Sequence, residues 1–442
     1  MQAIDTLIHA RWIVPVEPEG RVLERHSLAV DRGRIVAVLD HRDATARYQP
    51  KETIDLPEHV LIPGLVNAHT HTAMSLFRGL ADDLPLMDWL QKHMWPAEAK
   101  WVSPEFVHDG SELAIAEMLK SGTTCFNDMY FFPDATARAA QTAGIRACIG
   151  LILIDFPSAW AGNADEYLHK GLQLHDALKH SPLITTAFAP HAPYTVADAP
   201  LEKVRMYADE LDIPIHMHVH ETAHEVQQAV AQSGKRPLER LTELGLLGPR
   251  LLAVHMTQLT DADIGTLAQA NVNVLHCPES NLKLASGTCP VSKLLKAGVN
   301  VALGTDGAAS NNDLDMLGEL RTAALLAKSA AFDPTVVPAH TALRLATLNG
   351  ARALGLDAHI GSLVAGKSAD ITAIDLSALS TQPVYEPLSQ IVYSVARDQV
   401  TDVWVAGKRL LANRTLTTLD ENAIRRRTQE WRDKIKITNK QN

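Results

Sequence analysis

Residues 60–75 of this chain of 442 residues read VLIPGLVNAHTHTAMS. An apolar run leads into two histidines, His69 and His71, that are separated by one residue. Side chains alternate between the two faces of a strand, so both imidazoles would leave the same face at successive levels. The stretch therefore predicts a buried strand whose end presents two imidazoles to one partner.

The pattern of residues 58–362 repeats strand and helix in alternation. Counting the run that leads into Asn67, we expect eight strands, the other seven at 123–127, 147–154, 184–189, 213–219, 251–255, 272–277 and 299–304. Eight β/α units predict an α/β fold with a closed, TIM-like (β/α)8 barrel. A doubly wound open sheet is the alternative, and it is disfavoured because no glycine-rich phosphate-binding fingerprint follows any of the strands.

The two ends of the chain have a different pattern. Residues 1–57 and 363–442 contain short apolar runs separated by turns, at 6–9, 12–14, 27–31, 34–39, 369–374, 400–406 and 408–411. Exposed strand edges in each end need a partner. We therefore expect both termini to form one composite β-sandwich domain, with an amphipathic helix at the end of the chain.

Composition excludes several classes of function. A net charge of −10 argues against nucleic acid as a partner, and no apolar run reaches the length of a membrane span. The start of the chain shows no signal peptide, and four scattered cysteines are typical of reduced thiols in the cytoplasm. The expectation is a cytoplasmic, globular protein, and composition indicates nothing about its chemistry.

Ligand-type side chains gather where the predicted strands end, which is where barrel active sites lie. These residues are His69, His71, His191, His218, Glu221, His255, His276 and Asp306. A lone HxH pair is more often part of a core or loop than of a metal site. Ligand-type residues at several strand ends of one barrel instead favour a metal site.

Three imidazoles and one carboxylate, with a position left open, form a catalytic site for zinc or ferrous iron. We choose His69, His71, His218 and Asp306 as the ligands of one divalent ion per subunit. Two ions are disfavoured because no lysine ends the fourth strand. His216 and His220 would share the strand face of His218, but we interpret them as histidines that do not bind the metal.

A bound divalent ion lowers the pKa of its water toward ~7, but proton transfers still need side chains. Asp306 can accept the first proton, and His255 can orient the attacking water. Glu221 lies three residues beyond His218 and would enter the same pocket as a proton shuttle. Its alternative role is that of an acid at a helix N-terminus.

The motifs HTH after the first strand, HxxE at the fifth, a single histidine at the sixth and GTDGAASNN at the eighth resemble the amidohydrolase superfamily. Within it, they look like the chlorohydrolase and nucleobase-deaminase branch. The resemblance covers essentially the whole chain. It implies one metal, usually zinc with iron or manganese as alternatives, hydrolytic displacement at a carbon of a nitrogen heterocycle, and a homo-oligomer.

Four further stretches, WPAEAKW (95–101), APHAPYT (189–195), HCPESNLKLASG (276–287) and GTDGAASNNDLDM (304–316), resemble 5′-methylthioadenosine/S-adenosylhomocysteine deaminases. That resemblance implies that Glu98 accepts hydrogen bonds from the ribose diol and that His191 contacts purine and ribose. Glu221 would protonate N1, and Asp306 and His255 would hold the tetrahedral centre at C6. The products would be ammonia and the inosine analogue. Without the resemblance, Glu98 is interpreted as a surface acid beside Lys100.

The chain departs from this pattern at residues 151–179, which contain no arginine. Arginine is the side chain that best grips a carboxylate such as that of homocysteine. Methylthioadenosine, whose tail is short and apolar, is therefore favoured over S-adenosylhomocysteine, with Met87, Trp89, Trp95 and Phe156 as candidates for the thioether pocket.

Two competing functions remain open. The first keeps the metal and changes the substrate to a free purine, a pterin or a triazine, for which a ribose-binding Glu98 has no use. The second is a non-catalytic assembly protein on the same fold, which is disfavoured because all four ligands and Glu221 are present.

Overall fold

The computed structural model describes residues 1–439 and divides into two compact units. The first unit contains Met1–Asn67, Glu117–Cys125 and Asp315–Thr418, and the second contains Ala68–Ala116, Phe126–Leu314 and the chain from Leu419 onward. Both units are therefore assembled from segments that are far apart in the sequence.

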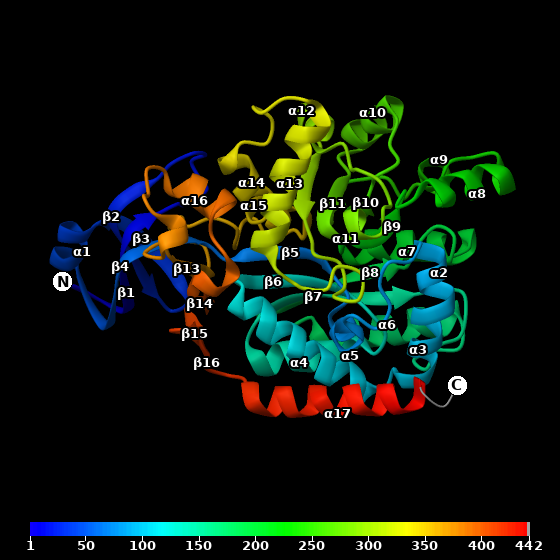
Figure 1. The fold of residues 1–442 in the computed structure, drawn as a ribbon, viewed down its shortest axis with the longest axis horizontal. Helices are drawn as coiled ribbons and strands as arrows, with labels where there is room; N and C mark the ends of the chain where they lie inside the picture. The colour runs from blue at the N-terminus through cyan, green and yellow to red at the C-terminus, as the bar shows by residue number, and fades with distance from the viewer. Residues whose placement is uncertain (440–442) are drawn as a thin grey trace. The chain divides into compact units, whose positions relative to one another are not determined.

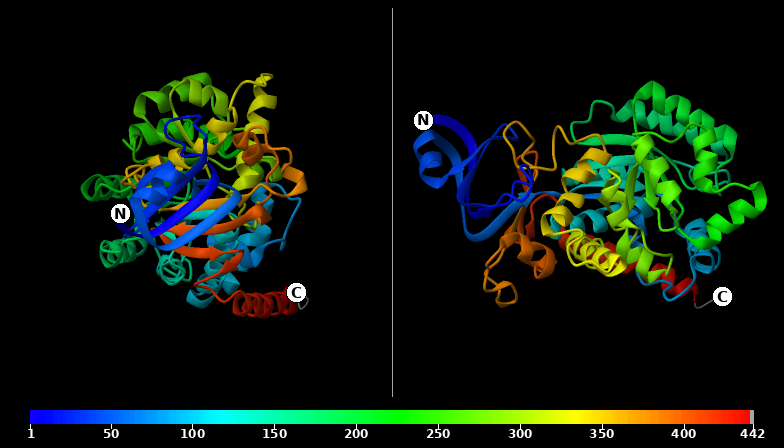
Figure 2. Two further views of the ribbon diagram at one scale, coloured as in Figure 1. Left: turned by 90° about the vertical axis from the view of Figure 1, so that its left-hand side faces the viewer. Right: turned by 90° about the horizontal axis from the view of Figure 1, so that it is seen from above.

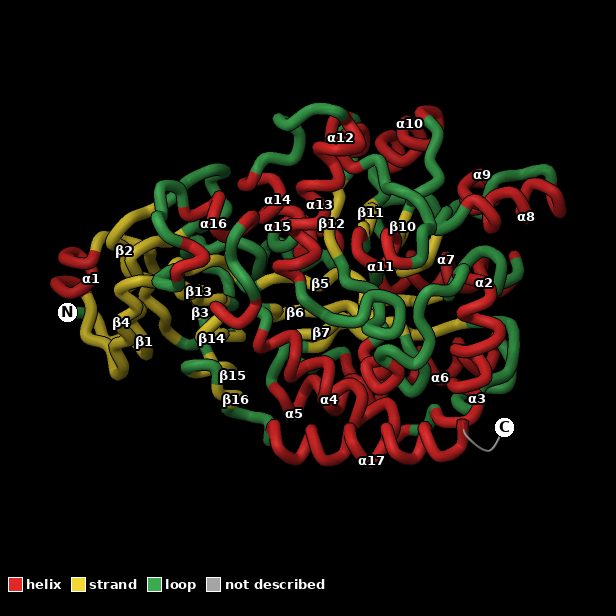
Figure 3. The backbone as a smooth tube through the Cα atoms, viewed as in Figure 1, coloured by secondary structure: helices red, strands yellow, loops and turns green. Residues whose placement is uncertain are grey.

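Eight parallel strands form the sheet that carries the candidate site. Their order in the sheet is their order in the chain: β5 (Leu65–Thr70), β6 (Thr123–Met129), β7 (Arg146–Leu153), β8 (Ile184–Pro190), β9 (Ile215–Val219), β10 (Leu251–His255), β11 (Asn273–His276) and β12 (Asn300–Leu303). Figure 3 shows these strands in yellow with red helices on their outer side. The predicted barrel is confirmed, and the doubly wound alternative is wrong because the strand order never reverses.

The last strand returns to the first at the carboxyl end of the sheet. The Asp306 backbone N–H donates to the His69 carbonyl at 3.0 Å. Gly304 lies so close to β5 that a Cβ on it would be 2.6 Å from the His69 nitrogen, so only glycine fits at this position. Closure of the barrel therefore brings the two ends that carry His69 and Asp306 together.

Helices follow most of these strands, and their ends match local sequence signals. They are α4 (Pro104–Lys120), α5 (Pro133–Ala143), α6 (Ala164–Leu178), α7 (Asp198–Leu211), α8 (Ala223–Ser233), α9 (Pro237–Glu243), α10 (Asp261–Ala270), α11 (Pro278–Lys283), α12 (Val291–Lys296), α13 (Met316–Ala331), α14 (Ala339–Leu345) and α15 (Leu348–Ala353). Helix α5 begins with Pro133 in its first turn and ends at Gly144, whose φ is 78°.

Strands from both ends of the chain form a second, mixed sheet, and Figure 2 shows blue and orange strands side by side in it. Its order is β16 (Thr415–Leu416), β15 (Lys408–Ala412), β14 (Val400–Val405), β13 (Ile371–Asp375), β4 (Tyr48–Pro63), β1 (Gln2–Ile13), β2 (Leu23–Asp31) and β3 (Arg34–Asp40). Helix α1 (His41–Arg47) packs against β1–β4, whereas α16 (Pro387–Tyr393) contacts α13 and α14.

This second sheet folds over its own core. Ile35 of β3 and Trp404 of β14 are buried in the same cluster although their strands are far apart in the sheet order. The turns at Gly33 and Gly407 also meet, since a Cβ on Gly33 would lie 2.5 Å from the Ala406 carbonyl oxygen. The composite domain predicted from the two termini is confirmed.

The apolar run at residues 60–66 contributes to two sheets rather than one. Strand β4 ends at Pro63, β5 begins at Leu65, and Gly64 lies between them. A Cβ on Gly64 would be 2.0 Å from the Thr124 hydroxyl, so the crossing requires glycine. The chain passes between the sheets without a linker, and the boundaries predicted at residues 57 and 362 stay predictions.

The last helix, α17 (Glu421–Asn439), lies along α4 within the second unit, as Figure 1 shows in red and cyan. Trp431 is buried against Phe106 with ring centroids 5.2 Å apart, and its Nε1 donates to Asp109 at 2.9 Å. The sequence grouped this helix with the terminal β domain, whereas these contacts are with α4. Residues 440–442 of the predicted tail lie outside the described residues.

None of the helices in residues 1–439 combines the length and apolar character that crossing a membrane requires.

We expect Trp431→Ala to lower the free energy of unfolding by about 3–5 kcal/mol, because it removes a large buried ring and leaves a cavity against Phe106. Urea denaturation followed by circular dichroism measures the change. Gln429→Ala, an exposed change on the same helix, is the control. A Trp431→Ala value within about 0.5 kcal/mol of the control would contradict the packing described here.

Candidate functional site

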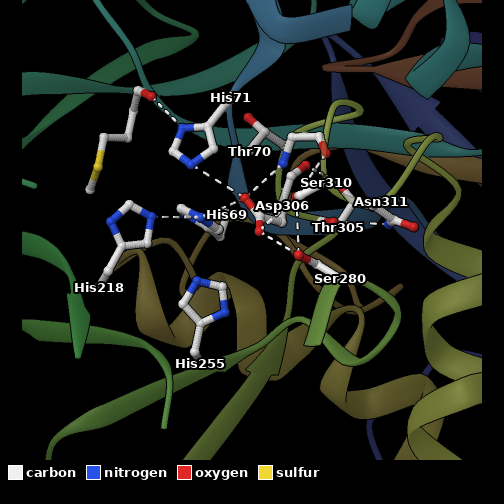
Figure 4. A network of polar contacts seen from close by, with 12 residues as sticks. His69, Thr70, His71, His218, His255, Ser280, Thr305, Asp306, Ser310 and Asn311 are labelled. Atoms are coloured by element: carbon white, nitrogen blue, oxygen red, sulfur yellow. Dashed lines mark hydrogen bonds and ion pairs between the residues drawn. The ribbon is translucent and has the colours of Figure 1, made fainter. Parts of the chain in front are cut away.

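Four side chains converge at the carboxyl end of the parallel strands, and Figure 4 shows them facing one another. His69 lies in β5, His71 follows it, His218 lies in β9 and Asp306 follows β12. The Nε2 atoms of His69 and His71 are each 3.3 Å from Asp306 Oδ1. The Nε2 atoms of His69 and His218 are also 3.3 Å apart.

The other ring nitrogen of each histidine is already engaged. His71 Nδ1 donates to the Met129 carbonyl at 2.6 Å, and His218 Nδ1 donates to the His191 carbonyl at 2.7 Å. A carbonyl oxygen only accepts, so both rings carry a proton on Nδ1 and present Nε2 to the site. Outer partners of this kind orient metal-binding histidines.

The Nδ1 atom of His69 is engaged by a fourth histidine, His216. His69 Nδ1 lies 2.8 Å from His216 Nε2, and His216 Nδ1 lies 3.2 Å from Asn127 Nδ2. From the sequence, His216 was interpreted as a histidine with no role at the metal site. The structure places it directly behind a candidate ligand, and the alternation His216-Met217-His218 on one strand face is the signal that could have indicated this role.

Asp306 is buried and fully engaged. Its Oδ2 accepts hydrogen bonds from Ser280 at 2.7 Å and Ser310 at 3.0 Å, and its Oδ1 accepts from the Gly307 backbone at 2.8 Å. Burial opposes its charge, but the hydrogen bonds from His69 and His71 outweigh burial and hold the pKa of Asp306 well below its ordinary value. A buried, ionised carboxylate of this kind calls for a cation beside it.

The pKa values of the three histidines also agree with a cation beside Asp306. Burial lowers the pKa of His69 to about 4 and that of His218 well below its ordinary value, so both rings are neutral at pH 7. Burial also opposes a charge on His71, yet Asp306 raises the pKa of His71 to about 9. Two neutral imidazoles and a carboxylate that draws a positive charge onto the third imidazole, where a metal would displace the proton, match the donor set of a divalent metal.

Glu221 and His255 stand beside these ligands. His255 Nε2 is 3.9 Å from a Glu221 carboxylate oxygen, and His255 Nδ1 is 2.9 Å from Asn281 Oδ1. Burial, helped by the charge of Asp306, raises the pKa of Glu221 to about 8. Glu221 is therefore protonated at neutral pH and can give up a proton inside the pocket.

A cavity of about 380 Å³ opens from His71. Glu98 and His191 line it, together with an apolar majority that includes Trp89, Trp95 and Phe156. Among the described residues, no lysine or arginine lines this cavity. Most of its wall is therefore suited to an apolar group.

Glu98 enters the cavity from α3 (Trp95–Trp101), which follows α2 (Leu86–Trp89) and a π-helical turn, η2 (Leu90–Met94). Tyr130 Oη donates to Glu98 Oε1 at 2.7 Å. Burial raises the pKa of Glu98 to about 7, although the Tyr130 hydrogen bond favours the ionised form. Before the family resemblance is considered, the sequence suggests that Glu98 is a surface acid beside Lys100. The structure instead places its carboxylate in the wall of the cavity. The sequence did not identify Tyr130.

Other candidates lie away from the cavity. His276 and His220 are buried but do not line it, and His220 Nε2 accepts from the Leu238 backbone at 3.2 Å. Met87, a candidate for the thioether pocket, lines a smaller cavity with Glu221 and Tyr194 instead.

A second cluster of metal-ligating types, His108, Asp109 and Glu112 on α4, is occupied by protein. Arg427 Nε lies 3.0 Å from Asp109 Oδ1, and the same guanidinium contacts Glu112. This cluster is an ion-pair site that joins α17 to α4.

Comparison with known proteins gives consistent matches over almost the whole chain. The model of the amidohydrolase family matches residues 60–410. Two proteins named 5-methylthioadenosine/S-adenosylhomocysteine deaminase, from Teredinibacter turnerae and Saccharophagus degradans, are each 51% identical to this chain. The alignments cover 98% of this chain and 98% and 97% of theirs.

Solved structures show the same relationship. An adenosine deaminase from Xanthomonas campestris with bound zinc is 57% identical and superposes with a TM-score of 0.98, and the match covers 99% of both chains. An atrazine chlorohydrolase from Arthrobacter aurescens complexed with zinc is 25% identical with a TM-score of 0.88, covering 96% of this chain and 99% of that one.

We expect Asp306→Asn and His218→Ala each to weaken zinc binding more than about 100-fold, beyond the 10–100-fold typical of losing an outer partner, because each removes a ligand. Competition against a fluorescent zinc chelator measures the affinity. His169→Ala, an exposed histidine on α6, should bind like wild type. Wild-type affinity in either ligand variant would contradict the ligand set.

Proposed function

We propose that this chain, which belongs to the amidohydrolase family, is a metal-dependent hydrolytic deaminase that converts 5′-methylthioadenosine to its inosine analogue and ammonia. S-Adenosylhomocysteine and adenosine are its further candidate substrates. The observation that carries the proposal is a metal-type ligand set with a protonated Glu221 beside it, and one of these ligands, His71, lines the cavity that also holds the carboxylate of Glu98. The names of the relatives support the same reaction.

His69, His71, His218 and Asp306 would hold the metal, which we propose to be zinc because similar structures contain it, with iron or manganese as alternatives. When bound, a divalent ion supplies a Lewis acid that makes water a nucleophile at neutral pH. The proton transfers and the orientation of the substrate are left to side chains of this chain.

Glu221 would give its proton to N1 of the adenine, since it is protonated at pH 7 and lies beside the site. Proton transfer to N1 removes electron density from C6, where water adds. Asp306 would take a proton from that water and pass it to the amine. As the C–N bond breaks and ammonia leaves, the C6 hydroxyl would give its proton back to Glu221, so the C6 carbonyl forms and both carboxyl groups return to their starting states. His255, held by Asn281, would hydrogen-bond the attacking oxygen and fix its direction.

Glu98 and His191 would recognise the nucleoside. An ionised Glu98 can accept both ribose hydroxyl protons, and Tyr130 already holds one of its oxygens in place. A buried carboxylate that expects hydroxyl groups disfavours substrates that lack them. A free purine, a pterin or a triazine would leave Glu98 without a partner, so these alternatives have less support.

The lining of the cavity favours some 5′ substituents of the nucleoside over others. Its wall contains Trp89, Trp95 and Phe156 and, in residues 1–439, no arginine or lysine. An apolar methylthio group suits this wall, whereas a homocysteine carboxylate would lose water without gaining a cationic partner. A homo-oligomer and a cytoplasmic location stay predictions.

We expect zinc-loaded protein to release ammonia from methylthioadenosine and Glu221→Gln to lower kcat at least about 100-fold, within the 10²–10⁴-fold typical of a positioned general acid or base. A coupled glutamate dehydrogenase assay measures the release. Faster release from methylthioadenosine than from S-adenosylhomocysteine would agree with the apolar wall. Absence of ammonia from every nucleoside, with zinc bound, would contradict the proposal.

We expect Glu98→Gln to raise KM for methylthioadenosine about 10–100-fold, because a hydrogen bond to a charged group contributes about 1.5–3 kcal/mol. The 2′,3′-dideoxy analogue, which lacks the diol, is the matched substrate and should be insensitive to the change. Because the pKa of Glu98 is about 7, its carboxylate forms as the pH rises through that value. The wild-type KM should fall over that range, and the KM of the variant should not. Equal effects on both substrates would contradict the role.

A further inference from the structure

Glu225 is a buried acid that the proposed reaction does not use. It lies in the first turn of α8, and only 7% of its surface is exposed. Burial of a carboxylate is unfavourable unless hydrogen bonds compensate. The partners of Glu225 therefore indicate what its burial achieves.

Both of its oxygens hold the backbone that carries Glu221. Glu225 Oε2 accepts from the Glu221 N–H at 2.7 Å, and Oε1 accepts from the His220 N–H at 3.1 Å. In an ordinary capping box, the acid at this helix position reaches the N–H of the N-cap residue. Here the N-cap is Thr222, and Glu225 reaches past it to the two residues before it.

The held segment is strained. His220 has a φ of 54°, in the left-handed region that residues with a side chain rarely adopt. Such a conformation persists only where surrounding contacts enforce it, and these conformations gather at functional sites.

Thr257 holds the same segment from the other side. Its hydroxyl donates to the Glu221 carbonyl at 2.6 Å, and its backbone N–H donates to the His220 carbonyl at 3.0 Å. The N–H and the carbonyl of Glu221 are thus both fixed, one from α8 and one from the loop after β10.

We propose that Glu225 and Thr257 are positioning residues that hold the backbone of the strained His220 and of Glu221 and so aim the Glu221 carboxyl at the substrate. We call Glu225 and Thr257 together the clamp. The inference rests on the proposed function, because the clamp is argued to serve the proton transfer by Glu221. Neither side chain lines the main cavity, so both act through Glu221.

The same chain offers a matched comparison. Glu239 occupies the equivalent position in α9, where its carboxylate accepts from the Arg236 N–H at 2.7 Å as an exposed cap. It makes the hydrogen bond of an ordinary capping box, without burial and away from the site. Glu239→Gln therefore reproduces the chemical change of Glu225→Gln at a helix cap with no catalytic neighbour.

The test compares Glu225→Gln and Thr257→Val with Glu239→Gln in the zinc-loaded protein. Glutamine keeps the volume of Glu225 but turns an N–H₂ toward one of the two N–H donors, and valine removes only the hydroxyl of Thr257. Steady-state ammonia release from methylthioadenosine separates kcat from KM. Zinc content and urea denaturation are measured on the same samples.

We expect kcat to fall about 10–100-fold in Glu225→Gln and in Thr257→Val, since misplacing a reacting group by about 1 Å has effects of this size. KM and zinc content should stay within about twofold of wild type, and Glu239→Gln should keep the wild-type kcat. A merely structural cap would change the urea midpoint without this separation of kcat from KM.

Three results would overturn the inference. The first is a wild-type kcat in both clamp variants, and the second is a loss of kcat that follows a loss of zinc or of folded protein. The third is an equal loss of kcat in Glu239→Gln. If wild type releases no ammonia from any nucleoside, the proposed function fails and the inference fails with it, whereas active wild type with unaffected clamp variants removes the inference alone.

Discussion

The site depends on one buried negative charge, that of Asp306. Its carboxylate is ionised although burial opposes the charge, because His69, His71, two serines and a backbone N–H all face it. An ionised group in such a place is stable only with compensation from its surroundings. His69 and His218 are neutral and supply lone pairs, whereas Asp306 draws a proton onto His71, at the place where a metal ion would supply the positive charge instead.

The fold supplies this arrangement through the ends of its strands. Gly304 allows β12 to approach β5 closely enough for Asp306 to meet His69. His220 and Asp306, which follow β9 and β12, and His255, the last residue of β10, have positive φ values of 54°, 63° and 74°. Such conformations persist only where surrounding contacts enforce them, and they gather at functional sites. Glu98, the proposed recognition residue, comes from a separate segment, α3, and not from the strand ends that carry the proposed ligands.

The sequence predicted those features that have local signals. Seven of the eight barrel strands appear as short apolar runs close to the observed bounds, and the ligand-type residues follow them directly. The first run was harder, because an unbroken apolar pattern hides the change of sheet at Gly64. That change depends on Thr124, which is distant in the sequence. His216, Tyr130 and Glu225 were missed for the same reason, since each acts through a contact that only the folded chain creates.

The central claim, that one metal ion is held by three histidines and Asp306, is tested most directly by crystals grown with zinc and measured on both sides of the zinc absorption edge. The account predicts one strong anomalous peak about 2.0–2.2 Å from the Nε2 atoms of His69, His71 and His218 and from an Asp306 oxygen. A peak at His108, Asp109 and Glu112 instead, or a peak near His69 that Asp306 does not contact, would contradict it.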